Sequence, residues 1–101
     1  MSTSPLRIRL APRAQRDLRR LERATVKRVQ TALIGLANGA PNLDVKAISG
    51  HPGWRRLRVG EHRVLYRELA AEELAAEDVA GGYLVARVID RHDLDRATEN
   101  L

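Results

Sequence analysis

Two spacings of apolar residues follow one another in the N-terminal part of the chain. Residues 6–10 alternate apolar and basic side chains, which predicts a β-strand with one buried face. Beyond Pro12, a residue suited to the first turn of a helix, the apolar positions fall three and four residues apart. This spacing predicts a first helix with a narrow buried stripe formed by Ala14, Leu18 and Leu21.

A second helix is predicted to follow almost at once. Thr25 is suited to cap its start, and Asn38-Gly39 is suited to end it because these residues tolerate left-handed backbone. Its buried face would carry Val26, Val29, Leu33 and Leu36. Because few residues join the two helices, we expect an antiparallel helical hairpin packed against a sheet.

The second half of the chain has the alternation expected of β-strands. Residues 45–53 contain two glycines and a proline and are predicted to form a loop. Residues 54–59 and 62–67 are separated by Gly60-Glu61, which predicts a β-hairpin with a two-residue turn. Because side chains alternate across a strand, Leu57 and Val59 share one face, whereas Arg56 and Arg58 share the opposite one.

The remainder of the chain predicts one further strand. Residues 70–80 hold four acidic residues and no basic one, which indicates a solvated extension of the hairpin, either a short helix or a loop. Residues 83–89 are nearly all apolar, as is typical of an interior strand. From Asp90 the chain leaves the sheet, and its last residues are expected to form a helical turn.

The predicted element order is β-α-α-β-β-β. Runs of helices and strands favour an α+β fold in which the helical hairpin covers one face of a small, mainly antiparallel sheet. The other face would stay open and would carry the basic residues of the strands. We expect residues 1–101 to form a single domain.

The composition narrows the class of protein. Hydrophobic residues make up 44% of the chain, which suffices for a core of Leu, Val, Ile and Ala in the absence of Phe. The absence of Cys excludes disulfides, thiolate metal sites and cysteine nucleophiles. No apolar run approaches the ~20 residues of a membrane span, and no signal peptide is recognisable. We therefore expect a soluble cytoplasmic protein that does not bind membranes.

The charge is unevenly distributed. Residues 1–63 hold 14 basic and 4 acidic residues, a net charge of +10, whereas residues 64–101 hold 4 basic and 9 acidic ones, a net charge of −5. A concentrated positive field attracts polyanions such as RNA and steers their encounter with the protein. The alternative is a charged surface that only contacts water.

Three arginines are expected to gather on the open face of the sheet. A two-residue turn places Arg58 opposite Arg63, and Arg56 lies one step further along the same face. Arginine binds phosphate through paired hydrogen bonds and keeps its charge throughout the physiological pH range. Arg91, at the end of the last strand, would add a fourth guanidinium. The structural alternative is that these side chains cover apolar neighbours and face solvent.

Other polar residues extend this prediction. Lys46 and Arg55 lie near the cluster in sequence and would add to an RNA-binding surface. His51, His62 and His92 are candidate general acids or bases, and His92 is favoured because it adjoins the last arginine of the cluster. The scattered histidines argue against a zinc site, and no phosphate-binding glycine loop or dinucleotide fingerprint is present. We therefore expect no metal and no cofactor.

The segment around the predicted hairpin resembles the RelE-like toxins of the RelE/ParE superfamily. Their pattern K-x-L-x-G…W-R-L-R-V-G-D-Y-R-V-x-Y is similar to K-A-I-S-G at residues 46–50 and W-R-R-L-R-V-G-E-H-R-V-L-Y at residues 54–66. R-D-L-R-R-L at residues 16–21 and V-I-D-R-H-D at residues 88–93 also match in order and spacing. The similarity covers residues 6–95.

The resemblance implies the toxin of a type II toxin–antitoxin system, bound by an acidic antitoxin in a hetero-oligomer. RelE-like toxins act on the ribosome and cut mRNA, where the ribose 2′-OH attacks the adjacent phosphate and leaves a cyclic phosphate and a 5′-OH. By position, Arg56 and Arg58 match the two basic hairpin residues of the family. Arg63 matches the arginine after the turn, and Arg91 matches the arginine that ends the last strand.

Two departures from the family pattern leave the acid–base group open. Asp95 stands where many RelE toxins have a tyrosine, and Asp90 stands where many have a histidine, with His92 two residues further on. The acid–base group would be His92, with Asp90, Asp95 or His62 as alternatives. Two other functions also remain open: non-enzymatic inhibition of DNA gyrase, as in ParE-like toxins, and a basic binding module without toxicity.

Overall fold

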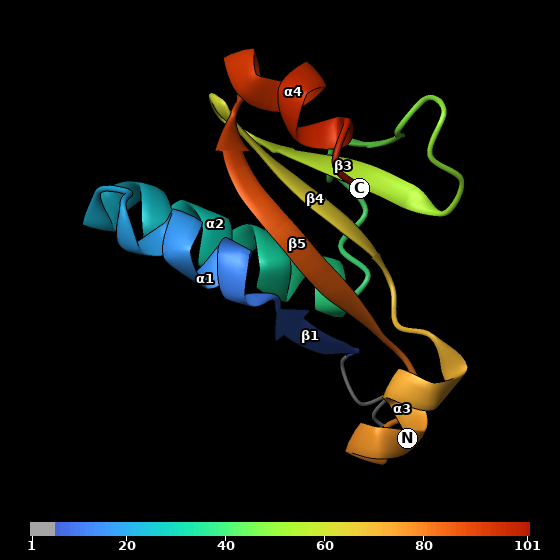
Figure 1. Ribbon diagram of the computed structural model, residues 1–101. Coiled ribbons are helices and arrows are strands. Elements are labelled where there is room, and N and C mark those ends of the chain that lie inside the picture. The colour runs from blue at the N-terminus through green and yellow to red at the C-terminus, as the bar shows by residue number, and fades with distance from the viewer. Residues whose placement is uncertain (1–5) are drawn as a thin grey trace.

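The computed structural model describes residues 6–101 and contains a five-stranded sheet flanked by helices (Figure 1). The strands are β1 (Arg7–Leu10), β2 (Val45–Ala47), β3 (Trp54–Val59), β4 (His62–Glu68) and β5 (Gly82–Asp90). Their order in the sheet is β1-β5-β4-β3-β2. β1 pairs with β5 in parallel, and the other neighbours are antiparallel, so the predicted α+β fold with a mainly antiparallel sheet is confirmed.

The helices are α1 (Pro12–Arg19), α2 (Arg23–Ala37), α3 (Ala71–Glu77) and α4 (Leu94–Thr98), with a 3₁₀ turn η1 (Arg91–Asp93) before α4. α1 begins at Pro12 and α2 ends before Asn38-Gly39, as predicted. The predicted cap of α2 is wrong, because Glu22 and not Thr25 precedes its first turn. The α1–α2 connection spans three residues, and Val26 N–H already donates to Glu22 O at 3.0 Å, so the helix starts earlier.

The helical hairpin packs on one face of the sheet, where the larger core lies. Leu57 and Val59 point into this core, which confirms the predicted alternation along β3. Burying one such side chain stabilises a fold by roughly 1.5–3 kcal/mol. The other buried members of this core are Ala14, Val29, Leu33, Leu36, Val64, Tyr66, Val85 and Val88.

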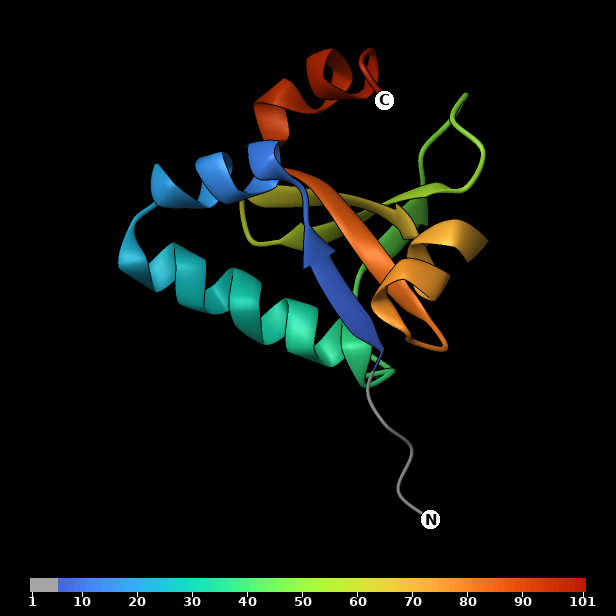
Figure 2. The ribbon, with the colours of Figure 1, turned by 60° about the horizontal axis from the view of Figure 1, so that its bottom comes forward.

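The opposite face of the sheet is partly covered, which corrects the prediction of an open face. Figure 2 shows α2 on one side of the sheet and α4 on the other. Ala97 of α4 packs on Leu65 and Ile89, which point outward from β4 and β5 and are both buried. These two apolar side chains form a second, smaller core on the outward face, and α4 shields them from water.

Two segments differ from or refine the predicted pattern. Residues 45–47 form the edge strand β2 and not a loop, because they pair with β3. A strand of three residues is too short for its alternation of side chains to be recognised in the sequence. The acidic extension contains the helix α3, one of the two alternatives for residues 70–80. Among residues 6–101, no helix is long and apolar enough to cross a membrane.

Candidate functional site

The β3–β4 hairpin places a set of basic side chains on the sheet face turned away from the helical hairpin. Arg58 and Arg63 are direct partners across the two strands, and Arg56 lies two residues before Arg58 on the same face. Lys46 of β2 is the cross-strand partner of Arg56 and extends this row. Arg91 follows β5, and its backbone N–H donates to Glu61 O in the hairpin turn at 2.8 Å.

Arg56, Arg58, Arg63 and Arg91, called here the arginine cluster, influence one another electrostatically. The pKa of Arg63 is lowered from its ordinary value, first by partial burial and then by the charges of Arg58, Arg56 and Arg91. Arg63 Nη1 donates to Gly60 O at 3.0 Å and to His62 O at 2.9 Å. These bonds fix the guanidinium in the half-buried turn, whereas 54% of the Arg58 side chain is exposed.

Two carboxylates only partly balance the four positive charges. Asp44 Oδ1 lies 3.5 Å from Arg56 Nη1, and its Oδ2 lies 3.9 Å from Arg58 Nη1. Glu61 Oε2 lies 2.8 Å from Arg91 Nε. Exposed ion pairs of this kind contribute about 0–1 kcal/mol each, so a phosphate can displace them at little cost. Neither acidic residue was expected at this site from the sequence, although Glu61 lies in the predicted turn.

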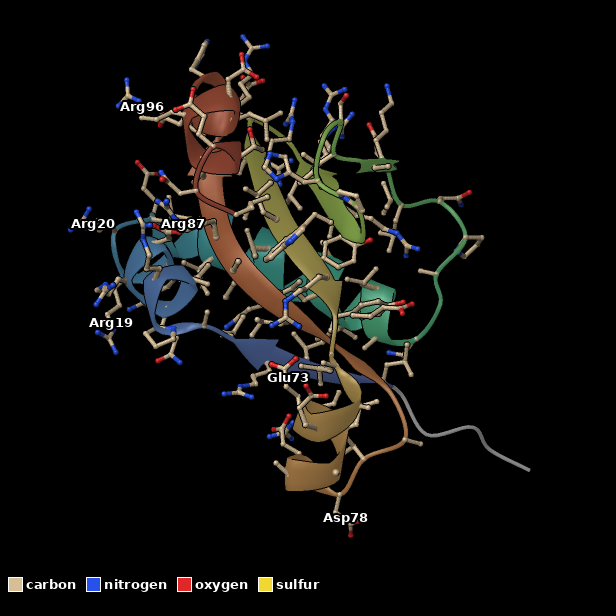
Figure 3. All side chains as sticks on the ribbon, turned by 45° about the vertical axis from the view of Figure 1, so that its right-hand side comes forward. Arg19, Arg20, Glu73, Asp78, Arg87 and Arg96 are labelled. Atoms are coloured by element: carbon tan, nitrogen blue, oxygen red, sulfur yellow. The ribbon has the colours of Figure 1, made fainter. Side chains whose placement is uncertain are left out.

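The other end of the same sheet face is neutralised by α3. Glu73 pairs with Arg67 at 2.7 Å and with Arg9 at 3.8 Å, and Glu77 pairs with Arg7 at 3.5 Å. Glu73 lies at the junction of α3 and the sheet in Figure 3. Hydrogen bonds from Arg67 and from the backbone of residue 70 lower the pKa of Glu73 to about 2. The uncompensated positive charge therefore concentrates near the hairpin turn.

His92 follows the last arginine of the cluster and is bound to Asp90. His92 Nδ1 lies 2.6 Å from Asp90 Oδ1, and the same oxygen accepts the His92 backbone N–H at 2.9 Å. These two bonds, the backbone bond first, lower the pKa of Asp90 below its ordinary value. Because an ionised carboxylate can only accept, Nδ1 carries a proton and Nε2 remains available for proton transfer. The His92 side chain is 74% exposed.

Several predicted residues lie away from this site. Arg55 is on the other face of β3, opposite Tyr66, which is 1% exposed and belongs to the core. Burial raises the pKa of Tyr66, while Arg55 partly opposes that shift. Asp95 lies on α4, and His51 lies in the segment between β2 and β3. Within residues 6–101, no three His, Asp or Glu side chains converge as a metal site requires.

His62 is the remaining alternative for the acid–base role. It is the cross-strand partner of Asp90 on β5 and of Val59 on β3. This register places it on the face of the helical hairpin, opposite to the face of Arg58 and Arg63. His62 adjoins Arg63 in the chain as His92 adjoins Arg91, and the same register places Asp90 on the face of His62. His92 differs from His62 in its hydrogen bond to a carboxylate, that of Asp90.

Three solved structures resemble this fold. The RelB–RelE antitoxin–toxin complex of Methanococcus jannaschii contains a chain with a TM-score of 0.64 at 19% identity, covering 88% of this chain and 96% of that one. The RelE–RelB complex of Pyrococcus horikoshii gives 0.60 at 18%, covering 86% and 96%. The RelBE2 toxin–antitoxin complex of Mycobacterium tuberculosis gives 0.57 at 24%, covering 86% and 99%. These likenesses establish the fold.

Sequence comparison assigns the family. No curated protein matches the chain at a significant level. Residues 8–94 match the family described as "ParE toxin of type II toxin-antitoxin system, parDE". This match spans β2 to β5, both helices of the hairpin and all of β1 except Arg7. The chain therefore belongs to the ParE toxin family of type II toxin–antitoxin systems, within the RelE/ParE superfamily.

Proposed function

We propose that this toxin is a ribosome-dependent mRNA endoribonuclease that needs no metal. The observation that carries the proposal is the arginine cluster beside His92, whose Nδ1 proton is fixed by Asp90. Arginines supply the positive charge that stabilises a phosphorane-like transition state, and an imidazole nitrogen supplies proton transfer. Both kinds of group lie at the end of β5 and the β3–β4 turn.

The geometry supports one division of labour. Arg56, Arg58 and Arg63 would hold the scissile phosphate. Arg91 would leave its ion pair with Glu61 and bind the negative charge that develops on the phosphate. The ribose 2′-oxygen would attack phosphorus, and the bond from phosphorus to the 5′-oxygen would break. His92 Nε2 would accept the 2′-OH proton, and water would give a proton to the departing 5′-oxygen, so that a cyclic phosphate and a 5′-OH remain. Lys46 would bind RNA next to the cluster.

The family assignment itself favours a second candidate, inhibition of DNA gyrase without catalysis. The matched family is described as the ParE toxin of parDE. In this reading, the arginine cluster would bind a polyanionic or acidic surface, and His92 would carry no acid–base role. The two candidates separate at their targets, because a ribonuclease stops translation whereas a gyrase inhibitor stops DNA replication.

We also propose that an acidic antitoxin neutralises the toxin, as the resemblance implies. A groove of about 630 Å³ lies between α2 and the β3–β4 turn, with Ala32, Leu43 and Val59 among its lining residues. Lys27, Arg28 and Arg58 also line this groove, which suits an acidic segment with apolar side chains. Because Arg58 belongs to both the groove and the arginine cluster, an antitoxin seated there would reach the proposed RNA site.

Timed induction in growing cells tests the proposed function. Incorporation of labelled amino acid and labelled thymidine is followed after induction, and mRNA ends are mapped in the same culture. An early stop in translation with new 5′-OH ends on ribosome-bound mRNA is the expected result. An early stop in DNA synthesis with intact mRNA would overturn it in favour of gyrase. Undisturbed growth at high expression would favour a non-toxic binding module.

A further inference from the structure

Two adjoining cavities lie beside α4 at some distance from the β3–β4 turn. One, of about 360 Å³, is lined largely by apolar groups, and its walls include Trp54, Ala86 and Leu101. The other, of about 280 Å³, is lined by Arg13, Arg87 and Arg96. The two cavities adjoin each other, because they share four lining residues: Arg13, Arg87, Ala97 and Asn100.

Trp54 gives the apolar cavity an aromatic lining residue. The indole is half-buried, and the Arg67 guanidinium lies 5.8 Å from its ring centroid. Arg67 does not line the cavity, and it is itself held by a two-point pair with Glu73 at 2.7 and 3.3 Å. The ring is thus fixed in place by α3 through an arginine. A fixed indole is a platform on which a nucleobase stacks, with a contribution of about 1–3 kcal/mol per base in known complexes.

The second cavity has the charge that a phosphate requires. Among residues 6–101, neither Arg13 nor Arg96 forms an ion pair, and both side chains are exposed. Arg87 is held by Asp17 at the base of the cavity, and one carboxylate, Asp93, lines the wall. Figure 3 shows Arg87 and Arg96 on the same side of the molecule. With Asp17 paired to Arg87 and Asp93 on the wall, the three guanidiniums face two carboxylates and keep a small excess of positive charge.

The two cavities also lie within reach of the arginine cluster. Arg56, Leu65 and Arg87 stand in one row across β3, β4 and β5. Neighbouring strands are about 4.8 Å apart, so the backbones at Arg56 and Arg87 are separated by roughly 10 Å. Leu65, in the middle of this row, is buried beneath Ala97 of α4, so an RNA strand that reaches both places would pass over α4.

We propose that the two cavities together form a subsite for one nucleotide of single-stranded RNA, with the base against Trp54 and the phosphate among Arg13, Arg87 and Arg96. The inference rests on RNA as the substrate in the proposed function and adds a second contact to it. A base outside the reacting bond would then be held by stacking while the arginine cluster holds the scissile phosphate. Stacking tolerates every base, so this subsite adds affinity with little sequence preference.

Trp54 is the single tryptophan of the chain and therefore reports directly on the pocket. The purified full chain is titrated with adenosine 5′-monophosphate and, separately, with ribose 5-phosphate, while tryptophan fluorescence is recorded. Free N-acetyltryptophanamide corrects for light absorbed by the nucleotide. We expect saturable quenching by the nucleotide and none by the sugar phosphate, because only the nucleotide carries a base. Absence of saturable quenching, or equal quenching by both compounds, overturns the subsite.

Two variants of equal charge locate the phosphate. Arg96→Ala removes a cavity arginine and should weaken nucleotide binding about tenfold, the loss typical of one charge-assisted contact. Arg19→Ala removes an exposed arginine of α1 that lines neither cavity and should leave binding unchanged. Equal binding by both variants overturns the phosphate assignment. The subsite and the proposed function fail in different experiments. If the toxin stops translation but its tryptophan fluorescence is not quenched by the nucleotide, the subsite alone is refuted. If the fluorescence is quenched but mRNA is not cleaved, the ribonuclease function alone is refuted.

Discussion

Asp17 and Arg87 form a two-point ion pair that joins α1 to β5 across 70 residues of sequence. The pair has distances of 2.8 and 3.2 Å, and Asp17 also accepts the backbone N–H of Val88 at 2.9 Å. The hydrogen bonds that Arg87 donates to Asp17, more than the negative charge of Asp17, raise the pKa of Arg87 above its ordinary value. One carboxylate therefore fixes the first helix to the last strand at a point where β1 no longer covers β5.

We expect Asp17→Asn to destabilise the fold. The change leaves a half-buried guanidinium without its counter-charge and should lower the free energy of unfolding by about 1–3 kcal/mol. Glu22→Gln is the matched control, because Glu22 is exposed and its side chain makes no capping bond. Denaturant titration of both variants measures the difference, and equal stabilities would contradict the structural role of Asp17.

Arg58→Ala should abolish most of the toxicity without unfolding the protein. Its side chain is 54% exposed and makes only a long contact with Asp44, whereas one preorganised donor contributes about 10²–10³ to rate. Arg20→Ala, at an exposed position directly after α1 and outside the arginine cluster, serves as the control. Growth after induction and cleavage of ribosome-bound mRNA measure the effect. Full toxicity of a stably expressed Arg58→Ala variant would exclude this residue from the site.

A test of Arg63 must measure stability as well as toxicity. Our sequence-based expectation of a solvent-facing side chain is corrected by its bonds to Gly60 O and His62 O. Arg63→Ala should therefore reduce toxicity and also lower the free energy of unfolding by about 1 kcal/mol, since the turn loses these bonds. Thermal unfolding measured beside mRNA cleavage separates the two effects. A fully toxic variant would show that the guanidinium serves only the turn.

His92→Gln should slow mRNA cleavage by about 10²–10⁴ if its Nε2 transfers the proton. Asp90→Asn should also slow it, because an amide no longer fixes the proton on Nδ1, although Asn can still cap η1. His51→Gln, in the segment between β2 and β3, is the control for the loss of one imidazole. Cleavage is measured on purified ribosomes with saturating mRNA. Wild-type rates in His92→Gln would move the acid–base role to Asp90, Asp95 or another group.

The contribution of Glu73 to stability should depend on pH. Its pKa falls from an ordinary 4.5 to about 2 in the folded chain, so the ionised form is favoured by folding. The stabilisation is complete above pH 4.5 and is lost as the pH falls towards 2. We expect wild type to exceed Glu73→Gln in stability at neutral pH and the two to converge in acid. Glu72→Gln, on the same helix without an ion pair among the described residues, should show no such convergence.

The sequence predicted the strands of the sheet better than it predicted α4, the helix that packs on the outward face of the sheet. Alternation in residues 54–59 was enough to assign Leu57 to the core and Arg58 to the other face, since a strand has a fixed period of two. α4 was expected only as a helical turn, because a five-residue segment has too few positions for a helical period to appear. The cavity beside Trp54 depends on how α4 sits on Leu65 and Ile89, which no local pattern encodes.

Some residues of the candidate site could also be placed from the sequence, and others could not. Arg58 and Arg63 could be paired from the length of the turn alone, because a two-residue turn fixes the register. Arg55 was assigned to the RNA-binding set by its proximity in sequence, yet one step along a strand moves a side chain to the opposite face. The bond of Asp90 to His92 was not foreseen, since it depends on the turn that the chain makes on leaving β5.

The parallel pairing of β1 with β5 limits how early the sheet can form during protein synthesis. Arg7–Leu10 leave the ribosome first, yet their partners in the sheet are residues 82–85. The first strand must wait for nearly the whole chain before it acquires its hydrogen bonds, and such distant pairings are slow to form. Arg91 and His92 emerge later still. The sheet therefore cannot close until residues 82–85 have been synthesised, 75 residues after the strand with which they pair.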